Sequence, residues 1–186
     1  MKGQRKDSDM DEKEQDRIKA LEVAMNNEAR EREFYLRHSE RTRHPLGKEM
    51  FRTLAEEEQE HMERIRLLHR RLEQQGRWPE DVPVELKGTR VKNVLDSVVE
   101  SIRKIPDAER DDLEAVRVAM EFEAKGEAFY SELARKADDP REKEFFALLS
   151  SLEHEHLVSL KDTQEFFRDP EGWYTAKERH SLDGGA

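Results

Sequence analysis

The sequence predicts an all-α protein, in which four long helices form a bundle of two helical hairpins. Apolar residues recur every three to four positions along almost the whole chain, which is the spacing of amphipathic helices rather than of strands. Proline and glycine are few and fall mainly between these helical segments. The second half of the chain also repeats the pattern of the first half. Together these observations indicate one domain with two similar halves.

Composition restricts the kinds of protein that this chain can be. A chain of 186 residues is long enough for one domain with a sizeable core. Charged residues make up 42% of the chain and the formal net charge is -10, which disfavours binding to nucleic acids or anionic membranes, because both need a basic surface. No segment is long and apolar enough to span a membrane, and the charged N-terminus lacks the apolar part of a signal peptide. We therefore expect a cytoplasmic protein that binds neither nucleic acid nor membranes.

The boundaries of the long helices follow from the positions of proline and glycine. Pro45 and Pro140 suit the first turn of a helix, because the N–H groups there have no partner within the helix. The segments "HPLG" and "GRWPEDVP" interrupt the helical pattern. We expect long helices over residues 11–43, 45–75, 107–139 and 140–169. Within each half a short turn joins two of these helices, so each half should be an antiparallel hairpin.

The segments outside the long helices are a crossover and two tails. The stretch "VKNVLDSVVESIRKI" has the apolar spacing of a shorter helix and lies between the two hairpins. Trp173 and Tyr174, near the C-terminus, are expected to dock either on the bundle or on a second subunit. The chain divides into a polar tail over residues 1–10, the bundle over 11–168 with its crossover over 76–105, and a C-terminal tail over 169–186.

An internal duplication relates the two hairpins. At an offset of 95 residues, as from Glu28 to Glu123, "VAMNNEAREREFY" aligns with "VAMEFEAKGEAFY", and "PLGKEMFRTLAEEEQEH" aligns with "PREKEFFALLSSLEHEH". The same offset relates polar residues as well as apolar ones. It aligns Tyr35 with Tyr130, Pro45 with Pro140, Phe51 with Phe146, Glu58 with Glu153, and His61 with His156.

Several of the repeated polar residues occupy positions where the helices should be apolar. In the stretch "LAEEEQEHME", Glu58 and His61 continue the buried face that Leu54 begins. Folding the four helices together should bring six such side chains into one core. They are Glu28, Glu58, His61, Glu123, Glu153 and His156.

Burying these carboxylates needs a compensating charge. Even one ionised carboxylate buried without a partner costs several kcal/mol or becomes protonated, and four together repel one another. Two divalent cations would neutralise four carboxylates, and each could take one histidine. Because the chain has no cysteine, any metal must be bound through oxygen and nitrogen. A single E-x-x-H sequence is usually a solvated helix face, but the duplicated pattern predicts a two-metal site.

Other polar residues of these helices leave alternatives open. Tyr35 and Tyr130 follow Glu28 and Glu123 by two helical turns, and they either fill core volume or hold a ligand carboxylate through the hydroxyl. The histidines outside the predicted site are expected to be solvated. They are His38, His44, His69, His154 and His180.

The paired E-x6-Y and E-x-x-H helices resemble the rubrerythrin family of the ferritin-like superfamily, over residues 18–168. The resemblance implies a ferritin-like bundle with a non-haem di-iron site. Glu58 and Glu153 would bridge the irons, while the remaining ligands would be terminal. These terminal ligands would be Glu28, Glu123, His61 and His156. Rubrerythrins reduce hydrogen peroxide to water, whereas relatives in the superfamily oxidise and store iron, and the fold alone does not choose between them.

The sequence departs from better-known rubrerythrins in two respects. It lacks the cysteines of their rubredoxin-like centre, so electrons would come from a separate donor protein. Those proteins also have an additional glutamate one turn after the third-helix ligand, whereas Gly126 stands at that position here. Gly126 would allow close packing or leave room beside a metal, or it reflects drift. The matching position after Glu28 is Glu31, either an extra ligand or a solvated residue.

The predicted function is therefore that of a rubrerythrin-type oxidoreductase with two iron ions, which reduces hydrogen peroxide. Two alternatives remain open, an iron-oxidising or iron-storage protein that uses dioxygen, and a helical interaction module with a structural metal. Ligands of this type also accept Mn²⁺ or Zn²⁺, so iron rests on the resemblance. A homodimer is expected from the family.

Overall fold

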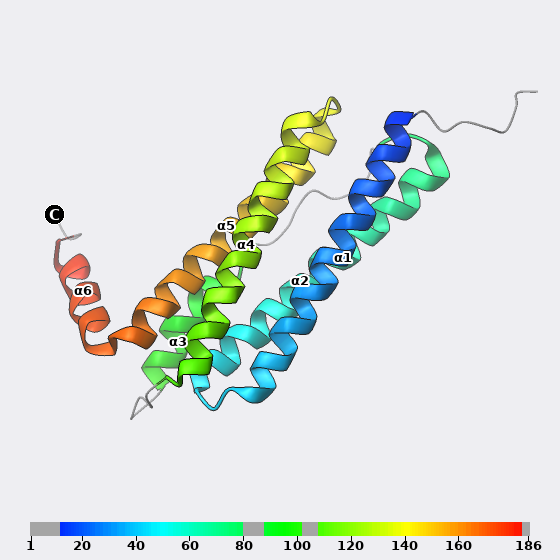
Figure 1. Cartoon of the computed structure of the whole chain (residues 1–186). Helices are drawn as coiled ribbons and strands as arrows, with labels where there is room; N and C mark the ends of the chain where they lie inside the picture. The colour runs from blue at the N-terminus through cyan, green and yellow to red at the C-terminus, as the bar shows by residue number, and fades with distance from the viewer. Residues whose placement is uncertain (1–11, 80–87, 102–107, 184–186) are drawn as a thin grey trace, which may run out of the picture.

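The four long helices form two antiparallel hairpins that lie side by side (Figure 1). The computed structural model describes residues 12–79, 88–101 and 108–183. The long helices are α1 (Glu12–Arg41), α2 (Pro45–Gln75), α4 (Arg110–Lys136) and α5 (Pro140–Arg168). Within the described ranges every regular element is a helix, which confirms the predicted all-α bundle.

Local capping interactions set the ends of these helices. Gly76 ends α2 in the left-handed conformation, with a φ of 65°, and its N–H donates to the carbonyl of Leu72. Asp139 precedes α5, and its side chain accepts hydrogen bonds from the N–H groups of two residues in the first turn. Helix α4 starts at Arg110, later than predicted, because Glu109 caps it. The residues just after Pro106 that were predicted to be helical lie in part outside the described ranges.

The crossover contains a short helix, as its apolar spacing predicts. It consists of the 3₁₀ turn η1 (Val91–Asn93) and the helix α3 (Val94–Ser101). Val91 is fully buried, and Leu95 is nearly so. The predicted apolar stripe continues to Ile102 and Ile105, which lie outside the described residues.

The C-terminal segment is helical rather than only a tail. Helix α6 (Pro170–Asp183) extends from the end of α5, at the left of Figure 1. Trp173 is buried, its ring centroid lies 5.4 Å from that of Phe166, and its indole N–H donates to Asp162 at 2.7 Å. Trp173 therefore docks on its own bundle, which was one of the two predicted alternatives.

Apolar residues form two separate clusters along the bundle. One cluster contains Tyr35 and Leu54, and the other contains Leu21 and Ile65. Along α1 and α2 the predicted ligands fall between these two clusters, so the polar centre lies in the middle of the bundle, enclosed at both ends. The charged residues on the apolar helix faces are therefore buried, and each of them needs a partner that offsets the cost of removing its charge from water.

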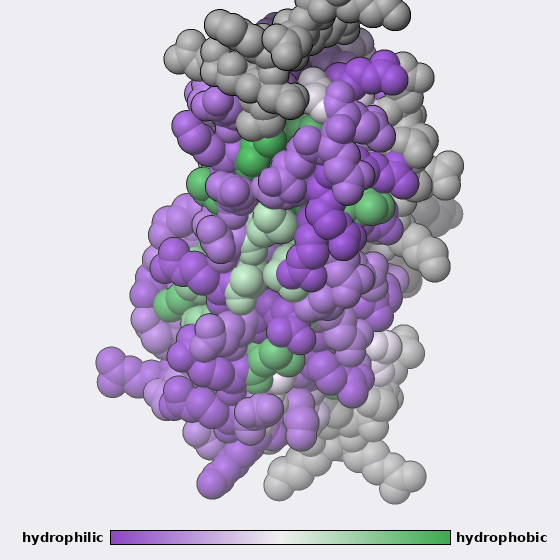
Figure 2. Space-filling view, turned by 90° about the vertical axis from the view of Figure 1, so that its right-hand side faces the viewer, coloured by the Kyte–Doolittle hydropathy of each residue, from purple (hydrophilic) through white to green (hydrophobic). Residues whose placement is uncertain are grey.

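The outer surface has the opposite character. Figure 2 shows the right-hand side of Figure 1, which is mainly hydrophilic and has only separate hydrophobic patches. Among the described residues, no helix has the length and apolar character needed to cross a membrane.

Candidate metal centre

Six predicted ligands converge at the centre of the bundle. Each hairpin contributes one glutamate from its first helix and an E-x-x-H pair from its second helix. The side chains are Glu28 of α1, Glu58 and His61 of α2, Glu123 of α4, and Glu153 and His156 of α5, and none is more than 3% exposed.

The six side chains form two overlapping groups of four. In each group, one ligand atom from every residue lies within 4.8 Å of the others. The His61 group consists of Glu28, Glu58, His61 and Glu153, and the His156 group consists of Glu58, Glu123, Glu153 and His156. Glu58 and Glu153 belong to both groups, so the arrangement provides two neighbouring cation positions with two shared carboxylates.

Both histidines direct the same ring nitrogen into the cluster. The Nδ1 atom of His61 lies 3.0 Å from a Glu58 oxygen and 3.2 Å from a Glu28 oxygen. The Nδ1 atom of His156 lies 3.3 Å from Glu123 and 3.4 Å from Glu58. The two rings are nearly parallel, with centroids 5.7 Å apart. Each group therefore combines one imidazole nitrogen with carboxylate oxygens, which suits divalent transition metals.

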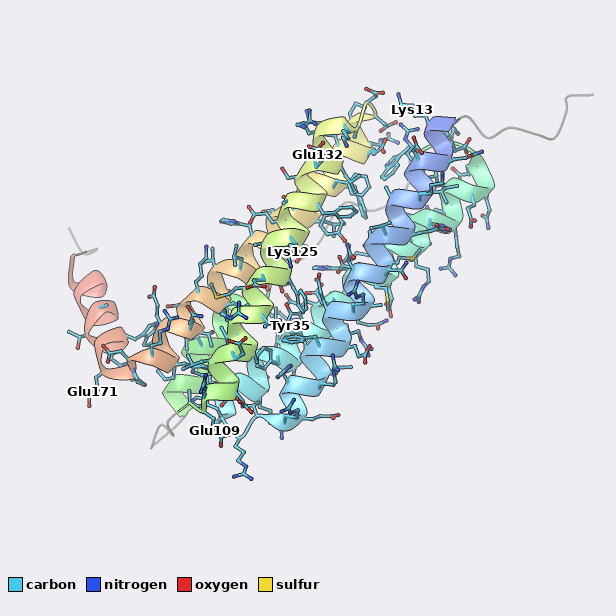
Figure 3. All side chains as sticks on the ribbon, viewed as in Figure 1. Lys13, Tyr35, Glu109, Lys125, Glu132 and Glu171 are labelled. Carbon is cyan, nitrogen blue, oxygen red and sulfur yellow. The ribbon has the colours of Figure 1, made fainter. Side chains whose placement is uncertain are left out.

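The two tyrosines connect the hairpins through hydrogen bonds to ligand carboxylates. The Tyr35 hydroxyl, which lies between the hairpins in Figure 3, donates to Glu123 at 2.5 Å. The Tyr130 hydroxyl donates in the same way to Glu28. Each tyrosine thus contacts the glutamate of the opposite hairpin. Of the two alternatives from the sequence, core filling alone does not account for these hydrogen bonds.

The electrostatics of the cluster follow from burial. Burial and the neighbouring Glu58 carboxylate raise the pKa of Glu28 to about 8, and burial raises the pKa of Glu153 well above its usual range. Burial alone would lower the pKa of His61, but the Glu58 and Glu28 carboxylates outweigh it and raise that pKa to about 10. Burial would likewise raise the pKa of Glu58, but His61 and His156 lower it below its usual value. Without a metal, the cluster therefore retains protons that a cation would displace.

The carboxylate of Glu153 shows whether the cluster suits a metal, because its oxygens need a partner. Both of its carboxylate oxygens are fully buried and accept no hydrogen bond. Buried carboxylate oxygens normally have a donor, because leaving them without one costs free energy. Glu153 also belongs to both groups of four, so a cation in either position would satisfy it. The residues present therefore fit a pair of divalent cations.

The position that departs from the family pattern packs closely against Glu153. A Cβ atom added at Gly126 would lie 3.3 Å from Cγ and from Cδ of Glu153. The close-packing alternative for Gly126 thus agrees with the structure.

Glu31 of α1 and Gly126 of α4 line the same cavity. Glu31 is only 8% exposed, and this cavity between α1 and α4, which Lys125 also lines, has a volume of about 240 Å³. Burial and the nearby Glu58 and Glu123 carboxylates raise its pKa to about 10. Of the two alternatives for Glu31, a solvated residue does not agree with this burial, and the role of an extra ligand stays untested.

Sequence reasoning missed Glu57, which contacts the cluster from outside. Its carboxylate lies 2.8 Å from Nε2 of His156. Glu57 precedes the predicted ligand Glu58 on a helix rich in charged residues, where a further glutamate does not by itself indicate a role in the site. The available indication was the comparison of the repeats, because the residue aligned with Glu57 is the apolar Leu152.

Three of the histidines that were expected to be solvated are buried or partly buried. The side chain of His69 is 13% exposed, and His38 is partly buried with its ring centroid 4.3 Å from that of Phe34. His44 is 3% exposed, and its ring centroid lies 4.5 Å from that of Phe167. It occupies the turn between α1 and α2, where the end of α5 covers it. His154, by contrast, is exposed and pairs with Glu127 at 3.1 Å.

We expect the metal-free protein to lose thermal stability as the pH rises from 6 to 9. Glu28 and His61 hold protons in the folded state up to pKa values of about 8 and about 10, above their ordinary values of 4.5 and 6.5. The folded state therefore binds more protons in this range, and stability falls by up to about 1.4 kcal/mol per pH unit for each such proton. Melting curves after chelation would measure the slope.

The variant Glu28→Gln serves as the control, because it removes one titrating carboxyl group and should flatten the slope. The metal-bound protein should depend less on pH, since the cations replace the protons. A melting temperature of the metal-free protein that stays constant or rises over this range would contradict the electrostatic description of the cluster.

Gly126→Ala should separate stability from metal binding. Alanine favours a helix interior by about 1 kcal/mol relative to glycine, so the metal-free variant should be about as stable as the wild type or more so. The added Cβ must displace Glu153 by a few tenths of an ångström, which should weaken metal retention. Ser131→Ala, on the exposed face of α4, is a matched control for helix propensity. Unchanged metal affinity in Gly126→Ala would show that the close packing has no effect on the site.

Comparisons with known proteins agree with this architecture. The family model described as Rubrerythrin matches residues 19–164. Among solved structures, the chain is similar to "Hypothetical Protein Pfu-1136390-001" from Pyrococcus furiosus, with a TM-score of 0.62 and 23% identity, covering 83% of this chain and 92% of that chain. At this identity the likeness shows the fold alone. No curated protein matches the chain significantly. Because the family model matches well over half of its residues and its predicted ligands converge in the core, the chain belongs to the rubrerythrin family.

Proposed function

We propose that this protein is a non-haem di-iron oxidoreductase that reduces hydrogen peroxide to water. The observation that carries the proposal is the pair of overlapping ligand groups, which share Glu58 and Glu153 in the core of a rubrerythrin-family bundle. Four carboxylates and two divalent cations together are neutral, which resolves the cost of burying the glutamates. Iron is the metal that the family suggests, and Mn²⁺ or Zn²⁺ are the alternatives to be tested.

The proposed ligand roles follow from the composition of the two groups. Glu58 and Glu153 would bridge the metals, because each is common to both groups. One metal would take Glu28 and His61, and the other would take the corresponding pair from the second hairpin, Glu123 and His156.

The bound irons would supply the two electrons that cleave the O–O bond, in the overall reaction H₂O₂ + 2H⁺ + 2e⁻ → 2H₂O. Tyr35 and Tyr130 would hold Glu123 and Glu28 in place through the hydrogen bonds described above. The cavity beside Glu31 offers a small molecule a route toward the centre from between α1 and α4. The apolar clusters at both ends would exclude bulk water.

The electrons would come from a separate donor protein. The chain has no cysteine and so cannot hold the cysteine-bound iron centre with which other members of the family deliver electrons. Assembly into a homodimer stays a prediction.

One observation favours iron oxidation and storage as a second candidate function. Gly126 replaces the additional glutamate of the family, so a ligand change that accompanies reduction could not occur at that position. The third class, a helical interaction module with a structural metal, would bury the same six side chains and stays an alternative.

We expect two metal ions per chain. After anaerobic reconstitution with Fe²⁺ and desalting, elemental analysis should give about two ions for the wild type. Glu58→Ala combined with Glu153→Ala removes both shared carboxylates and should abolish stable binding. The exposed glutamates Glu63 and Glu144 provide the control pair for substitution by alanine. If the wild type retains no more metal than the double variant, the two-metal site does not exist.

The diferrous protein should react faster with hydrogen peroxide than with dioxygen, and it should turn over when an external reductant is supplied. Stopped-flow mixing with each oxidant measures the two rates, and a further titration with Fe²⁺ measures iron uptake. Preference for dioxygen together with accumulation of many ferric ions per chain would replace peroxide reduction with iron storage.

A further inference from the structure

The duplicated halves differ in what contacts the outer nitrogen of each histidine. Nε2 of His156 lies 2.8 Å from an oxygen of Glu57, whereas Nε2 of His61 has no hydrogen-bond partner in the part of the chain that the structure describes. The residue aligned with Glu57 is Leu152, which cannot accept a hydrogen bond. His61 and Leu152 border a cavity of about 300 Å³, which Glu57 also lines.

The Glu57 carboxylate is itself held in place from the crossover. Thr89 donates its hydroxyl to one oxygen at 2.5 Å, and this is the oxygen that contacts His156. The other oxygen accepts the backbone N–H of Arg90 at 2.7 Å and its guanidinium Nε–H at 3.3 Å. Glu57 is 6% exposed and Thr89 is 3% exposed. A carboxylate with this many donors keeps its orientation, so the acceptor that His156 meets is fixed in position.

This contact determines which nitrogen of a neutral His156 would carry the proton. When a cation displaces the proton that Nδ1 holds toward Glu123, at 3.3 Å, an Nε2–H that donates to Glu57 leaves the Nδ1 lone pair for the cation. A carboxylate acceptor on the outer nitrogen also makes an imidazole a stronger ligand and restricts rotation of the ring. Among the residues that the structure describes, His61 has no such acceptor on its Nε2 atom.

We propose that Glu57 is a positioning residue that makes the two metal positions unequal, so that the position at His156 binds a divalent cation more tightly than the position at His61. The inference rests on the two-metal site proposed above and concerns the order in which its halves fill. The repeat supplies equivalent ligands to both metal positions. The two positions differ because Glu57 in the first repeat is replaced by Leu152 in the second.

Titration of the metal-free protein with Co²⁺ tests the proposal without any activity measurement. Visible absorption reports each Co²⁺ ion as it gains nitrogen and oxygen ligands. We expect two binding phases in the wild type. In Glu57→Leu, which gives both halves the same residue, the tighter phase should weaken by about 10- to 100-fold, as is usual when the partner of a histidine ligand is removed. Glu57→Gln keeps an acceptor and should show a smaller loss.

A purely structural role for Glu57, as an anchor of the crossover, predicts a different result. Loss of that anchor would weaken binding whichever histidine is present. We expect Glu57→Leu to weaken binding of the remaining ion in a His61→Ala background and to have no further effect in a His156→Ala background. Glu56→Gln is the matched control, because Glu56 also pairs with Arg90, at 3.1 Å, but lies on the exposed face of α2.

Each outcome of the titration bears on one proposal. The role of Glu57 would be overturned by any of three results. These are two phases of equal affinity in the wild type, unchanged affinity in Glu57→Leu, or an equal loss of affinity in both histidine backgrounds. Absence of Co²⁺ binding by a folded wild-type protein would instead overturn the two-metal site. Circular dichroism of every variant separates loss of the fold from loss of the contact.

Discussion

The burial of four carboxylates and two imidazoles in one core is the constraint on which this structure depends. Charges of one sign at such short range are tolerated only when protons or cations balance them. The bundle meets this condition by placing the cluster between two apolar clusters, which exclude solvent at both ends. The same exclusion makes the cluster effective, because a cation bound there would meet little competition from water for its ligands.

Duplication explains how so short a chain assembles such a centre. One hairpin supplies half of the ligands, and repetition of its pattern supplies the matching half. The tyrosines then join the halves, because Tyr35 of one hairpin holds Glu123 of the other, and Tyr130 holds Glu28. Seven residues along one helix are about two turns, so each tyrosine lies on the same helix face as the glutamate that precedes it. From that face each tyrosine contacts the glutamate of the opposite hairpin.

The fold and the six converging side chains could be predicted from the sequence because each polar residue interrupts an apolar face at a regular position. Glu58 and His61 can be identified as buried from their neighbours on the same helix. The role of Glu57 could not, since its contact with His156 joins α2 to α5 across residues that are far apart in the chain. The burial of His44 and the docking of Trp173 depend in the same way on where the end of α5 lies. Local periodicity reports which face of a helix is buried but not which residue of another helix meets it.

The departures from symmetry gather around the His156 half of the centre. Glu57 supports His156 from outside, and Glu31 lies close enough to Glu123 and Glu58 for their charges to raise its pKa. At the equivalent positions the repeat has Leu152 and Gly126, which carry no charge. The two halves thus have matching candidate ligands but different surroundings, and surroundings tune the affinity and redox behaviour of a bound metal. A duplicated site can therefore assign different tasks to its two metals while the side chains that would bind them stay the same.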